Sequence, residues 1–157
     1  MLHFYEPTEY QPKCNALYET YHRQLFLLIP HAKIEHIGSS VNPKSFSKGD
    51  LDIDVAVSQS EFEHSISQIK RLGFQEKLNT FRTPHLCMLE SQNNDDVAIQ
   101  WVVAGSEFES FILFRDRLRA SVDLVEQYNL LKLNSVFLSM NQYREKKSQF
   151  IRYVLSL

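Results

Sequence analysis

The sequence contains few glycines and few cysteines. It has four glycines in 157 residues, where an average domain of this length has about 11. The two cysteines, Cys14 and Cys87, lie far apart and outside any CxxC or Cys/His spacing. This excludes a disulfide scaffold and indicates a reducing compartment, with both thiols expected as small buried side chains.

Long hydrophobic runs and a strong excess of one charge are also absent. The longest aliphatic run, residues 25–29, is too short to cross a membrane, and the N-terminus is acidic without an apolar leader segment. Lysine plus arginine number 17 and aspartate plus glutamate 19, a net charge of -2. No overall positive field gathers nucleic acid. We therefore expect a cytoplasmic protein without membrane contact or a strong nucleic-acid signal.

What is present is the composition of one ordinary globular domain. Hydrophobic residues make up 43% and charged residues 23%, close to globular averages, and the length suits one domain. We expect a single domain over 1–157, with an α/β core over about 1–105 and C-terminal helices over about 106–157.

Hydrophobic spacing predicts a mixed α/β first part. Apolar residues recur with the helical period in some segments and alternate in others, and prolines and glycines separate them. The predicted elements are a helix from Pro12 to Pro30, strands at 33–37 and 51–57, a helix over about 61–72, and a hairpin of strands 86–90 and 97–103.

The remainder, from Glu107 onward, has no proline or glycine and keeps helical spacing throughout. Ser121 and Asn141 are suitable N-caps, which divides it into three helices. The predicted fold is α/β of the α+β type: a mixed sheet flanked by helices, followed by about three C-terminal helices.

Three aspartates alternate along the strand at 51–57 and its entry. Asp50, Asp52 and Asp54 lie on one face because the side-chain period of a strand is two, with neighbours about 7 Å apart. Like charges this close repel, and Mg²⁺ or Mn²⁺ relieves that repulsion if the face is enclosed. The alternative is a solvated strand edge protected by acids.

A short loop precedes this strand and contains Gly38, Ser39 and Ser40. Such a loop can bring backbone N–H groups and hydroxyls against phosphate oxygens, although by itself it fits an ordinary turn. Combined with Asp52 and Asp54 downstream, it predicts a loop that holds a triphosphate beside a metal held by carboxylates.

These residues resemble the polymerase-beta-like nucleotidyltransferase superfamily, and within it the GrpB family. The similarity extends over nearly the whole chain, and its most distinctive block is residues 113–119. The matching text comprises His36-Ile37-Gly38-Ser39-Ser40 with Pro43, Lys48 and Asp52, then Tyr5 to Tyr10, Leu72-Gly73-Phe74, Ala104-Gly105-Ser106, Leu113-Phe114-Arg115-Asp116-Arg117-Leu118-Arg119, Glu126-Gln127-Tyr128, Leu131-Lys132, and Tyr143 with residues 146–151.

The resemblance implies a nucleotidyltransferase-type core and a nucleoside triphosphate with Mg²⁺ or Mn²⁺ as ligands. We expect the catalytic acids to be Asp52 and Asp54 and the metal ligands Asp52, Asp54 and, less directly, Asp50. The expected nucleotide-binding residues are Gly38, Ser39, Ser40, Lys48 and Arg115. Lys48 could instead screen the acids, and Arg115 could instead pair with Asp116 or Glu109. The sequence does not indicate the acceptor.

A third carboxylate, usual in active members of the superfamily, is not evident on a neighbouring strand. The late strand, where GrpB relatives commonly carry histidines, reads Ile99-Gln100-Trp101, and Glu90, Asp95 or Asp96 could substitute. The alternatives to an active transferase are therefore a catalytically inactive nucleotide-binding or regulatory module, an interaction protein that uses its helical half, and a metal-dependent phosphoesterase.

Overall fold

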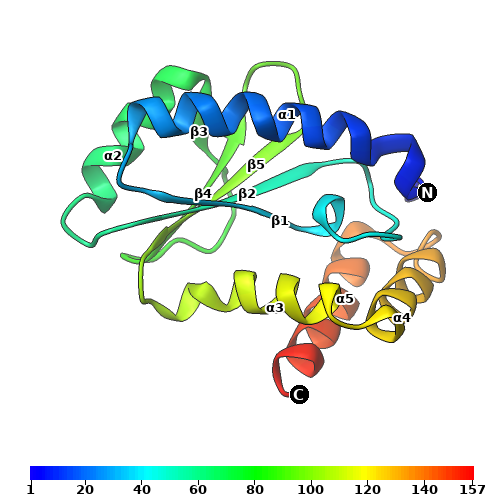
Figure 1. The fold of residues 1–157 in the computed structure, drawn as a ribbon. Coiled ribbons are helices and arrows are strands. Elements are labelled where there is room, and N and C mark those ends of the chain that lie inside the picture. The colour runs from blue at the N-terminus through cyan, green and yellow to red at the C-terminus, as the bar shows by residue number, and fades with distance from the viewer.

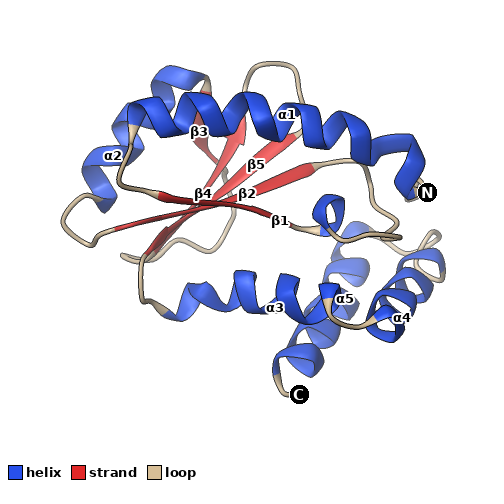
Figure 2. Cartoon of the chain, in the orientation of Figure 1, coloured by secondary structure: helices blue, strands red, loops and turns tan.

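The computed structural model describes residues 1–157 and contains a five-stranded sheet and five α-helices (Figures 1 and 2). The helices are α1 Pro7–Leu28, α2 Phe62–Ile69, α3 Ser110–Arg119, α4 Val122–Leu133 and α5 Met140–Leu155. The strands are β1 Lys33–Ile37, β2 Leu51–Val57, β3 Phe74–Glu76, β4 Leu86–Ser91 and β5 Val97–Val103, and short 3-10 helices span Ser39–Val41, Lys70–Leu72 and Glu107–Glu109. None of the helices has both the length and the apolar character needed to span a bilayer.

The sheet is mixed and is covered by helices on both faces. Its strand order is β1-β2-β5-β4-β3, with β2 and β5 parallel and all other neighbours antiparallel. Figure 1 shows α1 and α2 on one face and α3 on the other, with α4 and α5 beside the end of the sheet where β1 leaves it. The predicted fold class, including three C-terminal helices, is confirmed.

Strand β2 separates the core from the acidic face. Leu51, Ile53 and Val55 are fully buried in the main hydrophobic core beneath α1 and α2. Asp52 and Asp54 therefore point to the opposite face, toward α3, because side chains alternate along a strand. The burial of three large apolar side chains fixes the strand's register and thereby the direction of both carboxylates.

Two predicted helix starts are wrong. Helix α1 begins at Pro7, not Pro12, because Glu6 and Glu9 form a reciprocal capping box and Pro7 provides the first turn, which leaves Pro12 inside the helix. Helix α5 is capped by Ser139, whose side chain accepts the Gln142 N–H bond, and not by Asn141. Strand β3 was also not predicted, since three residues carry too little periodicity to detect.

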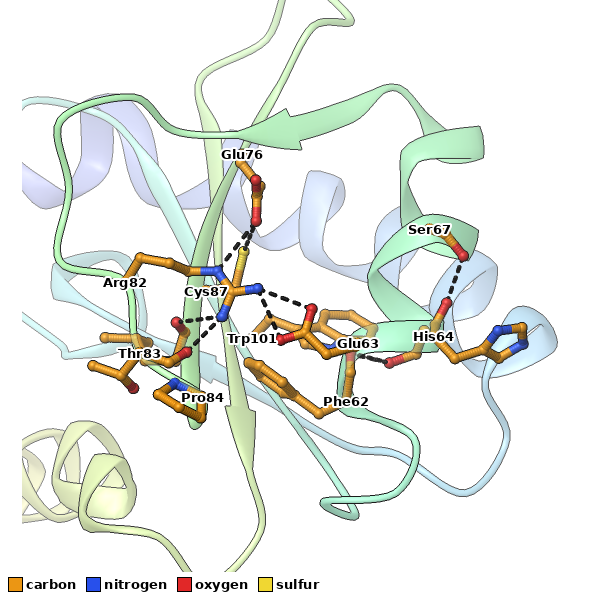
Figure 3. Close-up of polar contacts among 12 residues, drawn as sticks. Phe62, Glu63, His64, Ser67, Glu76, Arg82, Thr83, Pro84, Cys87 and Trp101 are labelled. Atoms are coloured by element: carbon orange, nitrogen blue, oxygen red, sulfur yellow. Dashed lines mark hydrogen bonds and ion pairs between the residues drawn. The ribbon is translucent and has the colours of Figure 1, made fainter.

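Arg82 holds together the segment that links β3 to β4 (Figure 3). Its guanidinium donates to both carboxylate oxygens of Glu63 at 3.1 Å and to Glu76 at 3.2 Å. It also lies over the Phe62 ring, 5.3 Å from the centroid. One arginine thus ties α2, β3 and the following loop together at the edge of the sheet.

We expect Arg82→Ala to lower the free energy of unfolding by about 1 kcal/mol, since the ion pairs are partly exposed and individually weak. Arg71→Ala, which removes an exposed arginine of the same region, is the matched control and should change it by less than about 0.5 kcal/mol. Urea unfolding measures both, and equal effects would contradict the structural role of Arg82.

Candidate functional site

The loop after β1 lies directly against the acidic strand. Gly38 has φ +77°, a backbone conformation that glycine adopts without strain. A Cβ at this position would lie 2.5 Å from Asp52 Oδ2. The main chain of the loop and the Asp52 carboxylate are therefore in contact, and only a residue without a side chain permits this approach.

Gly38→Ala should destabilise the protein and displace Asp52. Gly105→Ala is a closely matched control, because Gly105 has φ +80° but nothing lies within 4 Å of its added Cβ. Both variants carry the backbone strain, of order 1–3 kcal/mol, and only Gly38→Ala adds the clash. We expect it to cost at least about 1 kcal/mol more in thermal or urea unfolding; equal losses would show that the contact with Asp52 is unimportant.

The two serines of the loop have different partners. Ser40 is buried and lies 2.7 Å from His36 Nε2. His36 stacks on Tyr18 with ring centroids 4.7 Å apart, and burial together with Arg115 lowers the pKa of His36 to about 4. A neutral His36 thus positions Ser40, while Ser39 is held from the helical half of the chain.

Lys132 of α4 provides that contact. Its ammonium donates to Ser39 Oγ at 2.7 Å and to the Phe46 carbonyl at 2.5 Å, and it lies 3.9 Å from the centroid of the Tyr128 ring. The side chain is 2% exposed, and burial lowers the pKa of Lys132 to about 7, with Lys147 acting in the same direction.

Two further lysines, Lys48 and Lys147, act on Lys132 through their charges. Lys48, in the segment before β2, lies over the Tyr143 ring at 5.8 Å from its centroid, and burial lowers its pKa. The charge of Lys147 in α5 acts on Lys48, on Lys132 and on Asp52. Lys132 thus contacts the loop directly, while Lys48 and Lys147 from two other segments lie close enough to act on that lysine through their charges.

Asp54 is a buried carboxylate and Asp52 a half-buried one, both on the face toward α3. Burial is the main cause that raises the pKa of both carboxyl groups. At Asp54 the charge of Glu35 adds to the effect, and the pKa is about 7. At Asp52 the charge of Asp50 adds to it. The Asp54 side chain is 1% exposed and its Oδ2 has no hydrogen-bond partner. An unpartnered, buried carboxylate oxygen has the chemistry of a cation ligand.

The neighbours of Asp54 on the sheet are Glu35 of β1 and Gln100 of β5, which occupy the paired register positions. Glu35 is bound by Arg115, and the Gln100 Oε1 atom is buried without a partner. The acceptor oxygens next to Asp54 are thus one carboxylate already paired with a guanidinium and one amide oxygen that is free.

The three acids considered as substitutes for a third carboxylate do not join Asp54. Asp95 accepts a hydrogen bond from the Tyr21 hydroxyl. Glu90 pairs with Ala98, two strands from Asp52, about 10 Å away at the usual strand spacing. Asp96 lies before β5, in the loop after β4. Asp50 likewise precedes β2, where its Oδ1 lies 3.5 Å from Ser47 Oγ.

Arg115 is turned toward the sheet. Its guanidinium donates to Glu35 Oε2 at 2.6 Å, to the His36 carbonyl at 3.1 Å and to Asp116 at 2.9 Å. The alternative in which Arg115 pairs with Asp116 is therefore present in the structure. These contacts hold α3 against the end of β1, just before the Gly38–Ser40 loop begins.

The residues present fit a divalent cation as a pair of carboxylates. No group of three or more His, Cys, Asp or Glu side chains comes together that could hold a metal ion. Asp52 and Asp54 would supply two carboxylates, and the unpartnered oxygens of Asp54 and Gln100 are available acceptors. Mg²⁺ commonly uses one or two carboxylates together with substrate phosphates and water.

The fold is similar to that of the polymerase-beta-like nucleotidyltransferases. The chain matches the Cid1 poly(U) polymerase with a TM-score of 0.56 and 15% identity over 80% of this chain and 41% of that one. The GLD-2/RNP-8 complex gives 0.55 and 11% over 82% and 48%. The chain thus spans less than half the length of these two proteins.

The family is defined by closer matches. The family model described as GrpB protein matches residues 6–156, and the protein therefore belongs to the GrpB family. A UPF0157 protein of Vibrio cholerae serotype O1 is 49% identical over 154 residues, 98% of this chain and 82% of that protein. The crystal structure of GrpB from Enterococcus faecalis has a TM-score of 0.80 and 21% identity, covering 97% and 94% of the two chains.

Three residues that the structure brings to the site have no role predicted from the sequence. Lys132 follows Leu124 and Tyr128 at intervals of four residues, so all three lie on the same face of the predicted helix. A charged residue on an otherwise apolar face was the signal that could have revealed Lys132. Glu35 lies on an alternating strand, but its face could not be assigned before the pairing with Asp54 was known. Gln100 lies on the late strand where GrpB relatives commonly carry histidines, and the sequence indicated nothing further about it.

Proposed function

We propose that this GrpB protein binds a nucleoside triphosphate with Mg²⁺ and transfers its nucleotidyl group to an acceptor hydroxyl. The observation that carries the proposal is the position of the Gly38–Ser40 loop. It contacts the Asp52 carboxylate on one side and the Lys132 ammonium on the other. This position of the loop, between a carboxylate and an ammonium group, supports a site for anionic phosphates and a cation.

In this proposal the loop and the basic residues bind the phosphates, and the acidic residues bind the metal ion. Backbone N–H groups of the Gly38–Ser40 loop and the Ser39 hydroxyl bind the β- and γ-phosphates, the buried Ser40 fixes the loop through His36, and Lys132 and Lys48 offset the negative charge of the phosphates. Asp52 and Asp54 hold Mg²⁺, which when bound neutralises charge that develops on the phosphates. The acceptor oxygen forms a bond to the α-phosphorus, and the bond from that phosphorus to the pyrophosphate oxygen breaks.

Arg115 is assigned a positioning role in the same proposal. It holds Glu35 and the His36 carbonyl, and both residues belong to the strand that leads into the loop. Its guanidinium thereby fixes the direction in which Gly38 leaves the sheet. We also propose a cytoplasmic location, in keeping with two buried thiols that form no disulfide.

One observation favours a second candidate, a nucleotide-binding protein without turnover. Gln100 is uncharged and stands beside Asp54 on β5, where a carboxylate would complete a two-metal site. An amide oxygen attracts a cation less strongly than a carboxylate. This candidate predicts nucleotide binding without release of pyrophosphate.

The decisive experiment incubates the protein with γ-labelled nucleoside triphosphates and Mg²⁺ and measures release of labelled pyrophosphate together with thermal stability. Asp52→Asn should lower the rate at least about 100-fold, since loss of a metal ligand removes several kcal/mol of charge stabilisation. Asp123→Asn, on the exposed surface of α4, should leave it unchanged. Turnover that is unaffected by Asp52→Asn would refute the proposed role, and stabilisation without turnover would favour the second candidate.

A further inference from the structure

A second feature of the acidic face lies beyond Asp54, on the side away from the loop. A cavity of about 460 Å³ opens there between β2 and the start of α3, the helix that Figure 1 shows on this face of the sheet. Four carboxylates line it, from Asp54, Glu107, Glu109 and Asp116, against one ammonium from Lys33. The cavity is therefore strongly acidic in a protein of nearly balanced charge.

The acids are not all compensated by partners within the chain. Asp116 is paired with Arg115, and Glu107 lies 3.5 Å from His85 Nδ1. Glu109 accepts only the Gly105 N–H, through Oε1. Asp54 is 1% exposed, lines the cavity, and has no partner for Oδ2. A buried carboxylate oxygen that lacks a donor is an independent indication of a cationic ligand.

The size and spacing of the site distinguish between kinds of cation. The carboxylates are distributed around the wall and do not form a group of three that could share one metal ion. The volume lies within the range of pockets for small organic ligands, and Leu113 adds an apolar part to the lining. These features suit an organic molecule that carries ammonium groups at separated positions on an aliphatic frame.

We propose that the cavity between β2 and α3 binds an organic ammonium compound, an amino alcohol or polyamine derivative, and that this compound is the acceptor. The acceptor role rests on the proposed nucleotidyl transfer, whereas binding of the amine does not. Ammonium groups would pair with Glu107 and Glu109 at the mouth of the cavity. Asp54 belongs to both the proposed metal pair and the cavity wall, so a hydroxyl placed beside it would lie next to the nucleotide.

The transfer step balances with no additional reactant. The acceptor hydroxyl oxygen forms its bond to the α-phosphorus of the nucleotide, pyrophosphate leaves with the electron pair of the broken bond, and the hydroxyl proton passes to water. The ammonium groups are protonated and not nucleophilic, which leaves the hydroxyl as the reacting group. Their part is to hold the acceptor in place.

The test measures binding of spermidine to the whole protein by calorimetry, without nucleotide and at physiological ionic strength. Triethylene glycol, an uncharged chain of the same length, is the ligand control and should not bind. Glu109→Gln should weaken spermidine binding at least about fivefold, and it keeps an oxygen to accept the Gly105 N–H. Glu126→Gln removes one charge from the exposed surface of α4 and should change binding less than about twofold.

Absence of spermidine binding would overturn the proposal. Equal weakening by Glu109→Gln and Glu126→Gln would also overturn it, because the attraction would then come from the overall charge and not from the cavity. Equal binding of triethylene glycol would overturn it as well. Failure of the nucleotide to bind or react would refute the proposed transferase activity, yet it would leave the spermidine measurements unchanged. The two proposals therefore fail separately.

Discussion

Lys132→Met is expected to weaken binding of a Mg²⁺ nucleoside triphosphate at least about 100-fold while the folded protein stays as stable as the wild type or becomes more stable. The loss follows from removal of the cation that faces Ser39 in the loop. A charged hydrogen bond contributes about 1.5–3 kcal/mol, and 2.7 kcal/mol corresponds to about 100-fold in affinity.

The expected stability has a different cause. Lys132 is 2% exposed and forms no ion pair with a carboxylate. Burial lowers the pKa of Lys132 from 10.5 to about 7, because the folded state disfavours the charged side chain. Lys132 therefore lowers the free energy of unfolding, and this loss grows as the pH falls from about 10 toward 7. Methionine fills a similar volume without that cost, although Ser39 Oγ and the Phe46 carbonyl lose a donor.

Nucleotide-dependent shifts in melting temperature and direct titration measure the two effects together. Lys146→Met, on the exposed surface of α5, is the matched control for charge and should bind nucleotide nearly as the wild type does. Unchanged affinity in Lys132→Met would mean that the lysine only supports the loop. A cooperative loss of folding would instead contradict the expected stability.

Asp54→Asn is expected to stabilise the metal-free protein, and to do so by about 2 kcal/mol more at pH 8 than at pH 5. Burial, with Glu35 as a second cause, raises the pKa of Asp54 from 3.8 to about 7. The folded state therefore holds the proton more tightly than the unfolded state. The stability that this provides is complete below about pH 4 and is lost as the pH rises through 7.

Asparagine cannot ionise, so the variant avoids the cost of a buried, unpartnered carboxylate at pH 8. The charged groups nearest to Asp54, namely Glu35, Arg115, Glu109 and Lys33, stay in place. Urea unfolding in the presence of a chelator at both pH values measures the difference. Asp123→Asn should show little dependence on pH, and an equally flat result for Asp54→Asn would contradict the inferred burial of charge.

The same variant should lose the response to Mg²⁺ and nucleotide. A residue that lowers the stability of the free protein while it binds a cation is typical of functional sites. Gain of stability with loss of ligand response would therefore support a binding role for Asp54. Retention of the full response would assign the carboxylate to the cavity alone.

The positions of the strands were predictable because their signal is local. The ranges of β1 and β2 are those that the alternation predicts. The cap of α5 was missed because Ser139 and Asn141 are both good N-cap residues. Only the side-chain bonds between Ser139 and Gln142 decide between them.

The candidate site was predictable in part for a similar reason. Gly38 and Asp52 are linked in the sequence by a short segment between two neighbouring strands, so that a pattern could suggest their contact. Lys132 reaches Ser39 from 93 residues away, and no local pattern states which end of a buried helical stripe meets which loop. Gln100 joins Asp54 only through the parallel pairing of β2 with β5.

By itself the sequence determined the mixed α/β fold, the glycine-serine loop and the alternation that puts Asp52 and Asp54 on one face, since these depend on residue type and period. The tertiary structure alone decided what surrounds them. It places Lys132 against Ser39 of the loop, pairs Arg115 with Glu35, and forms the acidic cavity between β2 and α3. These contacts join residues distant in the chain, and the packing of the helical half against the sheet brings them together.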